Sequence, residues 1–530
     1  MPATHTPPDQ PYADPTAYGN GPADSVADTT ENAATTHHTI ALGGRKIDYT
    51  ATAGHLVTVD PSSSKPTAKI FYVAFTADPA NAQNRPVTFF YNGGPGSSSV
   101  YIMLGSFAPT RLKTALPDFT PPAPYTLEPN PDSLLDRSDL VFINPVGTGY
   151  SAAIEPHTNK DFWGVDQDAG SLRQFIKRFL TKYDRWNSPK FLFGESYGTA
   201  RSCVLAYLLH EDGVDLNGVV LLSSILDYSQ AGNPVGLLPT LCADAWYHKK
   251  ITVAPPPPDL PSFVAAVVPF AQNDYAKALA AFPDADPATV QTLSADTGIA
   301  PTVLTSWEGL NVADTDARGT LHFLTTLLKA QGKALGAYDG RATGVGTGIA
   351  AAINPLSGGN DPTMTAVNGA YTTAWNTFLE DDLKFTSTSS FTDLNDQAFQ
   401  NWDFGHIDPT GAQKGKDVDG NIVLYTAGDL AATMALNVDL KVLSANGYFD
   451  SVTPFSQTVT DLTNMPLTDA VVRQNLTTKF YPSGHMVYLD GDSRTAFKAD
   501  LAAFYDSTVQ NHAAVQRIRS LQAATREARQ

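Results

Sequence analysis

Short apolar runs alternate with amphipathic stretches along much of the chain. Runs typical of β-strands lie at 39–42 with 46–50, and at 68–76, 86–91, 139–143, 190–194, 218–226, 440–445 and 477–481. The later runs are almost continuously apolar, as strands covered on both faces of a parallel sheet must be. Most of these runs are therefore expected to pair in one buried sheet.

Helical spacing separates several of the predicted strands. Between the runs at 139–143 and 190–194, the apolar residues Leu172, Phe175, Ile176 and Phe179 recur at the spacing of one helix face. A second helical pattern covers 199–210, directly after the strand at 190–194. This alternation predicts an α/β fold with a mostly parallel, doubly wound sheet.

The alternation also divides the chain into parts. It runs through 39–230, stops over about 231–420, and resumes over 421–508, which predicts a sheet domain interrupted by a large, mainly helical cap. Residues 1–38 are rich in Pro, Thr, Ala and Asp, which predicts a flexible tail. A polar helical tail is expected over 509–530.

The sequence Gly194-Glu195-Ser196-Tyr197-Gly198 lies between a predicted strand and a predicted helix. This is the setting in which a G-x-S-x-G pattern forms a nucleophile elbow, a tight turn that holds a serine hydroxyl above the sheet. A glycine-flanked serine in an ordinary loop is the alternative. The strand and helix on either side favour Ser196 as a nucleophile.

A serine nucleophile needs a histidine to accept its proton and a carboxylate to orient that histidine. His485 follows the predicted strand at 477–481, and Asp450 follows the one at 440–445. Asp490 and Asp492 are also close to His485, but they come after it in the chain. The order Ser196, Asp450, His485 is the order found in α/β-hydrolases.

A glycine-rich loop, Tyr91-Asn92-Gly93-Gly94-Pro95-Gly96-Ser97-Ser98-Ser99, comes directly at the end of the predicted strand at 86–91. A phosphate cradle or a plain turn is the alternative, but the Lys-Ser/Thr of a phosphate-binding loop is missing. Backbone N–H groups of this loop, together with the N–H of Tyr197, could stabilise an oxyanion at the attacked carbonyl.

Composition excludes several kinds of partner. The formal net charge is −18, so nucleic acid and anionic membranes are not expected to bind. The two cysteines provide no disulfide framework, and no apolar run reaches the length of a membrane span. Because no secretory signal is visible at the N-terminus, a cytoplasmic location is favoured. The oligomeric state is left open.

Five motifs in order, NGGPGSSS, DLVFINPVGTGYS, FLFGESYG, GYFDSVTP and SGHMV, resemble the serine carboxypeptidase family, peptidase family S10, in a bacterial-type form without disulfides. The resemblance implies an α/β-hydrolase fold and a Ser196, Asp450, His485 triad. It also implies an oxyanion hole at Gly94 and Tyr197. Its substrate would be a peptide with a free C-terminus, and no metal or other cofactor would be needed.

The same resemblance places Asn92, Gly93 and Glu195 at the substrate's terminal carboxylate. Members of the family pair such a glutamate with a second one, but Ser106 stands at the expected position here. We therefore expect Glu195 to be ionised at neutral pH and to repel that carboxylate, unless Arg111 or Arg201 compensates. Ser97, Phe90 and Asn144 also depart from the residues that are frequent in the family.

Three functions remain open on this reading. A serine-type carboxypeptidase fits all five motifs. An esterase or acyltransferase would use the same acyl-enzyme with a different substrate or acceptor, and the serine at position 106 weakens the case for peptides. A non-catalytic binding module is the third reading, although all three triad residues stand in their motifs.

Overall fold

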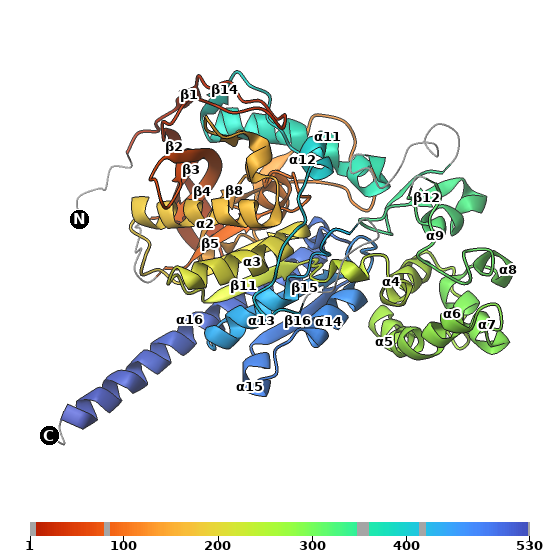
Figure 1. Cartoon of the computed structure of the whole chain (residues 1–530). Coiled ribbons are helices and arrows are strands. Elements are labelled where there is room, and N and C mark those ends of the chain that lie inside the picture. Colours follow the sequence, from red (N-terminus) through yellow and green to blue (C-terminus); the bar gives the residue numbers. More distant parts are fainter. Residues whose placement is uncertain (1–6, 79–84, 318, 347–359, 413–419, 528–530) are drawn as a thin grey trace.

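One large sheet organises the structure, as Figure 1 shows. The computed structural model describes residues 7–78, 85–317, 319–346, 360–412 and 420–527, with side chains described as far as residue 509. The large sheet has ten strands, nine of them in the order β16-β15-β11-β10-β5-β8-β4-β3-β2, and β9 pairs with β4. Their bounds are β2 Ala33–Leu42, β3 Arg45–Val59, β4 Pro66–Ala77, β5 Val87–Tyr91, β8 Asp139–Ile143, β9 Ala152–Ala153, β10 Lys190–Glu195, β11 Gly218–Leu222, β15 Lys441–Gly447 and β16 Leu476–Tyr481.

Neighbouring strands from β16 to β8 are all parallel, whereas β8, β4, β3 and β2 pair antiparallel. Every residue of β5, β8, β10 and β11 is buried, which explains why these strands read as continuous apolar runs. The predicted fold class is confirmed: this is an α/β-hydrolase fold. The remaining short strands are β1 Tyr12–Asp14, β6 Thr110–Leu112, β7 Leu127–Pro129, β12 Lys333–Leu335, β13 Thr343–Val345 and β14 Phe385–Ser387.

Helices cover both faces of the large sheet. On one face α2 (Val165–Lys182), α3 (Tyr197–Glu211) and α13 (Ala427–Leu436) pack against side chains such as Phe89 and Tyr91. On the other face the intervening Phe90 packs in a core shared with α11 (Pro362–Thr377) and α16 (Gly491–Glu527). Successive side chains of β5 thus enter opposite cores, as strand geometry requires.

A separate helical lobe lies beside the sheet domain and is coloured green in Figure 1. It holds α4 Pro234–Tyr247, α5 Leu260–Phe270, α6 Ala276–Ala281, α7 Pro287–Thr297, α8 Pro301–Leu304 and α9 His322–Thr326. These helices share a core of their own, which includes Leu241, Tyr275 and Phe323. The lobe begins close to the start of the predicted cap.

The predicted cap, 231–420, extends too far at its C-terminal end. α11, β14 and α12 (Asp396–Gln400) pack on the sheet domain, because the apolar face of α11 joins the core around Phe71 and Phe90. Spacing within α11 shows that it is amphipathic but not which core it joins. Residues 347–359 and 413–419 of the predicted cap lie outside the described residues.

The predicted flexible tail, 1–38, is wrong from residue 7 onward. Residues 33–42 form β2 and pair with β3 along their whole length, and Tyr12–Asp14 pair with β14. Backbone pairing and a buried polar network offset the entropy cost of ordering this segment. The amino-acid composition alone does not reveal these interactions. Residues 1–6 lie outside the described residues.

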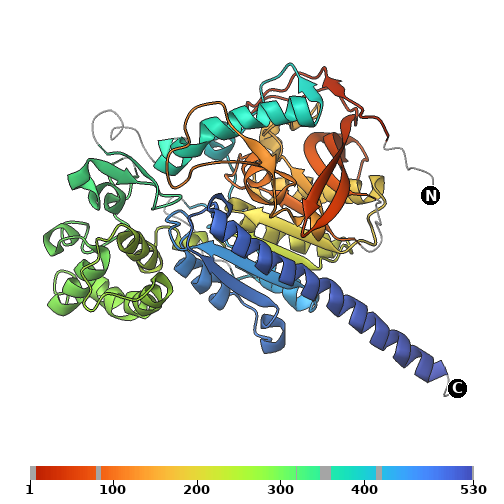
Figure 2. The same cartoon turned by 180° about the vertical axis from the view of Figure 1, so that it is seen from behind.

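The C-terminal part contains α14 Phe455–Asn464, α15 Ala470–Arg473 and the long helix α16. The predicted boundary at 508–509 falls inside α16, which runs unbroken from Gly491 to Glu527 and extends beyond the sheet domain (Figure 2). Cys203 and Cys242 are both buried and unpaired. Among the described residues no helix combines the length and the apolar character needed to cross a membrane.

Candidate active site

Ser196 occupies a strained turn between β10 and α3. Its backbone has φ 59° and ψ −131°, in the half of conformational space that residues other than glycine rarely adopt. The Ser196 N–H donates to the carbonyl of Leu222 at the end of β11 (2.9 Å), which helps to hold the turn. The predicted elbow residue therefore has the backbone geometry that a nucleophile elbow requires.

Both glycines of the elbow are demanded by close packing. A Cβ on Gly194 would lie 2.1 Å from the carbonyl oxygen of Gly198. A Cβ on Gly198 would approach the carbonyl oxygens of Tyr91 and Asn92 at 3.1 Å. Small residues at these two positions let the strand turn directly into the helix beside β5.

Asp450 and His485 form a buried pair at the carboxyl ends of β15 and β16. The Asp450 Oδ2 atom lies 2.8 Å from His485 Nδ1, and both residues are at most 2 % exposed. Asp450 Oδ1 accepts from the backbone N–H groups of Val452 and Thr453. The Thr453 hydroxyl donates to Asp450 Oδ2 (2.6 Å). These three hydrogen bonds hold the carboxylate in place independently of its contact with His485.

The loop that carries His485 reaches back toward the elbow. The hydroxyl of Ser223, one residue beyond β11, donates to the His485 carbonyl (2.6 Å). The His485 N–H donates to the carbonyl of Tyr338, and the two rings meet edge to face with centroids 5.2 Å apart. Sheet topology thus brings Ser196, Asp450 and His485 to one edge of the sheet, with Asp450 and His485 in direct contact.

The electrostatic environment of His485 favours its charged form. Burial lowers the pKa of the imidazole, but the charge and hydrogen bond of Asp450 and the nearby Glu195 carboxylate raise that pKa above its ordinary value. An imidazole in this setting can take up a proton and hold it next to a carboxylate, as a general base must.

Glu195 is the last residue of β10 and lies directly before the elbow serine. Its side chain is buried, and burial raises the pKa of its carboxyl to about 7. Asn92 Nδ2 (3.0 Å) and the Tyr488 hydroxyl (2.8 Å) both donate to Glu195 Oε2. Glu195 is therefore only partly ionised at neutral pH, contrary to the expectation that it would be ionised, because desolvation outweighs the charge of His485 and the two hydrogen bonds.

Ser106 does not take part in this carboxyl site through a hydrogen bond. It is buried in the π-helical turn Met103–Phe107, where its hydroxyl donates to the carbonyl of Ile102. Tyr488, three residues after His485, supplies a hydroxyl to Glu195 instead. No sequence pattern pointed to Tyr488, since only the folded loop brings it to the end of β10.

Both arginines proposed to compensate already form ion pairs with other carboxylates. Arg201 is fully buried, pairs with Asp168 (2.5 Å) and donates to the backbone carbonyl of Asn92 (2.6 Å). Arg111 forms an ion pair with Glu128. Arg201 instead holds the backbone at the start of the glycine-rich loop through its hydrogen bond to the Asn92 carbonyl.

The glycine-rich loop lies against the elbow. A Cβ on Gly93 would stand 2.5 Å from the backbone nitrogen of Tyr197, so these two segments touch backbone to backbone. Tyr197 is the first residue of α3, and an N–H at that position has no acceptor within its helix. Gly94, with φ 101°, follows Gly93 and precedes a cis proline. The predicted oxyanion residues Gly94 and Tyr197 thus lie on neighbouring segments.

Asn92 joins the loop to the carboxyl site. Its Nδ2 group donates to Glu195, and its Oδ1 atom accepts from the N–H of Ile102 (2.9 Å). Every polar group of the side chain is therefore used in fixing the loop and Glu195 relative to each other. Of the predicted substrate residues, Asn92, Gly93 and Glu195 form one cluster beside Ser196.

A cavity of about 280 Å³ opens beside the Asp450–His485 pair. Its lining is mostly apolar and includes Leu237, Ala337, Val452 and Thr453. Thr453 is the residue that also donates to Asp450. Within the described part of the chain no group of three or more His, Cys, Asp or Glu side chains is arranged to hold a metal ion.

Comparisons with known proteins agree with the geometry. Residues 44–249 match the family model described as serine carboxypeptidase. The mouse lysosomal protective protein is 27% identical over 184 residues, which is 34% of this chain and 35% of that protein. The pheromone-processing carboxypeptidase KEX1 of Uncinocarpus reesii is 31% identical over 118 residues, which is 22% of this chain and 17% of that protein.

These alignments span about a third or less of the length of the two relatives. Among solved structures, a prohormone-processing carboxypeptidase from Saccharomyces cerevisiae superposes with a TM-score of 0.52 at 15% identity, over 86% of this chain and 91% of that one. At such low identity the superposition shows the fold, which extends well beyond the part aligned in sequence.

Proposed function

We propose that this chain is a serine-type carboxypeptidase, which releases the C-terminal residue of a peptide, because residues 44–249 match the family model described as serine carboxypeptidase. One observation carries the proposal. A strained elbow serine, Ser196, shares one edge of the sheet with a buried Asp450–His485 pair and directly follows the buried Glu195, whose pKa burial raises to about 7.

In the proposed reaction, Ser196 Oγ attacks the carbonyl carbon of the last peptide bond while His485 takes the hydroxyl proton. The N–H groups of Gly94 and Tyr197 stabilise the oxyanion that forms. His485 then gives its proton to the leaving amine, which departs as the free C-terminal residue. Water, activated by the same histidine, hydrolyses the acyl-enzyme and restores Ser196.

Glu195, in its protonated form, would bind the terminal carboxylate of the substrate. Both donors to Glu195 meet Oε2, so a proton on Oε1 remains free to donate to a substrate oxygen. A buried carboxyl with a pKa of about 7 can carry that proton near neutrality. We propose that the cavity beside Thr453 receives a side chain of the bound peptide.

Two measurements test the proposal. Labelling with an organophosphonate fluoride should modify Ser196, and Ser196→Ala should abolish the modification. A peptide library digested by the protein and read by mass spectrometry should lose single C-terminal residues. Cleavage inside the peptides, or folded protein that is not labelled, would refute the proposal.

An esterase or acyltransferase is the second candidate, favoured because no second carboxyl group is a hydrogen-bond partner of Glu195 among the residues that the structure describes. The two functions separate on matched substrates: a blocked dipeptide with a free C-terminus, its ester and its amide. A carboxypeptidase should prefer the free acid, because only that substrate offers a carboxylate to Glu195. Equal or better turnover of the ester at every pH would favour the second candidate.

A further inference from the structure

Residues 10–31, here called the N-terminal strap, cross the molecule in an extended path. The strap begins at Gln10, which pairs with Thr35, and continues through β1, which pairs with β14. Val26 pairs with Ile154, and Glu31 binds Arg178 through both carboxylate oxygens (2.9 and 2.6 Å). The strap is thus attached at both ends and in the middle.

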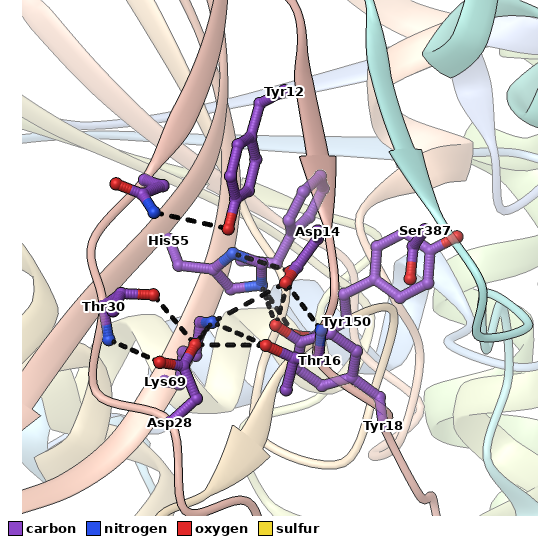
Figure 3. A network of polar contacts seen from close by, with 12 residues as sticks. Tyr12, Asp14, Thr16, Tyr18, Asp28, Thr30, His55, Lys69, Tyr150 and Ser387 are labelled. Atoms are coloured by element: carbon purple, nitrogen blue, oxygen red, sulfur yellow. Dashed lines mark hydrogen bonds and ion pairs between the residues drawn. The ribbon is translucent and has the colours of Figure 1, made fainter.

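A buried polar network fixes the strap to β3 and β4, as Figure 3 shows. Asp14 and Asp28 of the strap flank Lys69 of β4, whose side chain is 1 % exposed. The Tyr18 hydroxyl donates to Asp14 Oδ2 (2.7 Å) and lies 3.1 Å from Nε2 of His55, a β3 residue that is also buried. Breaking one of these buried ion pairs would leave a charge without compensation, so the strap is firmly held.

The strap in turn holds the segment 385–395. Beyond the pairing of β1 with β14, the Tyr18 N–H donates to the Ser389 hydroxyl oxygen (2.8 Å). The Ser389 hydroxyl lies 3.4 Å from the carbonyl of Thr16, to which it donates. This second attachment lies between β14 and Asn395.

Asn395 ends this segment and joins three parts of the chain. Its Nδ2 group donates to the carbonyl of Asn20 in the strap (2.8 Å) and to the carbonyl of Gly147 (2.8 Å). Its backbone N–H donates to the carbonyl of Gly96 (2.8 Å) in the glycine-rich loop. Its Oδ1 atom caps α12, so the buried side chain has no spare polar group.

The glycine-rich loop rests on this segment along several residues. Ser97 pairs with Leu394, and the Ser98 N–H donates to the carbonyl of Asp393 (2.9 Å). Gly96 has φ 99°, and a Cβ there would stand 2.6 Å from the Asn395 carbonyl oxygen. The loop and residues 393–395 are therefore in direct contact, so a displacement of 393–395 would also displace the loop.

We infer that Asn395 is a positioning residue, through which the N-terminal strap holds the glycine-rich loop at the distance from Tyr197 that an oxyanion hole needs. The inference rests on the proposed function, because it assigns the loop to oxyanion stabilisation. N–H donors stabilise a developing charge effectively only if they are held in position before the reaction. Glycine residues leave the loop with much backbone freedom, so contacts with other segments must hold it. Contacts that run from the N-terminal strap through Asn395 restrict the backbone movement of this loop.

Asn395→Ser tests this role, with Asn159→Ser as a matched control. Serine at 395 keeps an oxygen for the cap of α12 but removes both Nδ2 donors. Asn159 also donates through Nδ2 to the strap, at the carbonyls of Gly19 and Gly21, and is fully buried. No hydrogen bond joins Asn159 to the glycine-rich loop among the described residues.

The expected result is a loss of kcat of at least about tenfold in Asn395→Ser with KM within about twofold, because an oxyanion hole binds the transition state and not the substrate. Asn159→Ser should lower the melting temperature by a similar amount but keep kcat within about twofold. The pH midpoints of both variants should match those of the unchanged protein. Equal kcat losses in the two variants, or unchanged kcat in Asn395→Ser, would overturn the inference.

Two further measurements keep the inference testable if the first fails. Should Asn395→Ser not fold, Ser389→Ala removes an attachment one step further from the loop, and kcat should still fall while Asn159→Ser stays unaffected. Hydrogen exchange needs no activity: the amides of Gly94, Gly96, Ser97 and Ser98 should lose protection in the position 395 or 389 variant and keep it in the control. If the unchanged protein is not labelled at Ser196, the proposed function fails and the assignment of the loop to oxyanion stabilisation fails with it. Unchanged protection of the loop in the position 395 or 389 variant would instead overturn the positioning role by itself.

Discussion

Replacing Glu195 by glutamine should remove the alkaline limit of peptide hydrolysis. In the unchanged protein, Asn92 and Tyr488 donate to Oε2, and a proton is needed on Oε1 to bind the substrate carboxylate. In Glu195→Gln the amide oxygen can accept both donors, and the NH₂ group takes the place of the protonated Oε1. The variant therefore keeps the donor at every pH.

The size of the effect follows from the pKa of about 7 for Glu195. At that pKa about nine tenths of the molecules are protonated at pH 6 and roughly one tenth at pH 8. The ratio of kcat/KM between Glu195→Gln and the unchanged protein should thus rise about tenfold from pH 6 to pH 8. Loss of the Glu195 charge should also lower the pKa of His485, which shifts the acid limit to lower pH.

The assay measures kcat/KM between pH 4 and 9 on a blocked dipeptide and on its C-terminal amide. The amide lacks the carboxylate, so its profile should show the shifted acid limit but no gain at high pH in the variant. An alkaline limit that is the same in both proteins on the dipeptide would refute the assignment of Glu195 as the titrating donor. An acid limit that does not move would refute its electrostatic coupling to His485.

Three other changes test separate parts of the structure. Tyr488→Phe removes a donor that favours ionised Glu195, so the pKa of Glu195 should rise and the alkaline limit of kcat/KM should move upward by less than about one pH unit. Asp244 is fully buried and neither carboxylate oxygen has a hydrogen-bond partner among the described residues, and burial raises its pKa far above the usual value. Its protonated form is thus favoured by folding, so its contribution is complete below the pKa of the unfolded chain and falls by about 1.4 kcal/mol per pH unit above it. Asp244→Asn should therefore unfold at a higher temperature than the unchanged protein at pH 8, with a smaller difference at pH 5, and an equal difference at both would contradict this. Ala337→Leu should narrow the 280 Å³ cavity, raising KM for peptides with bulky residues more than for peptides of glycine and alanine, and a uniform change would show that the cavity does not receive a side chain.

Much of the sheet was predictable because its strands are buried on both faces. The runs at 86–91, 139–143 and 190–194 lie within one residue of β5, β8 and β10, since a strand without a solvent face cannot alternate apolar and polar residues. β2 was missed at its start, because Ala33–His38 read as polar and its inward side chains are small. Edge strands with few apolar residues carry little pattern for a sequence to reveal.

The candidate site was predictable only where chemistry imposes a local pattern. Ser196, Asp450 and His485 each stand at a strand end in a short loop, so strand order alone brings them to one edge. Tyr488 and Asn395 act through contacts between segments far apart in sequence, and neither type of residue is rare enough to attract notice. The pKa of Glu195 could not be predicted either, since it depends on burial and not on the identity of residue 106.

Residues 337–341 connect the helical lobe to the loop that carries His485. Arg341, which follows Asp339 and Gly340 in the lobe, donates to the carbonyl of Pro482 (2.8 Å) and pairs with Asp490 (2.9 Å). The Tyr338 carbonyl also accepts from the His485 N–H, so the lobe touches the histidine loop on both sides of the catalytic candidate. Because these bonds attach 337–341 to the loop that carries His485, a rigid displacement of the whole lobe would have to break them.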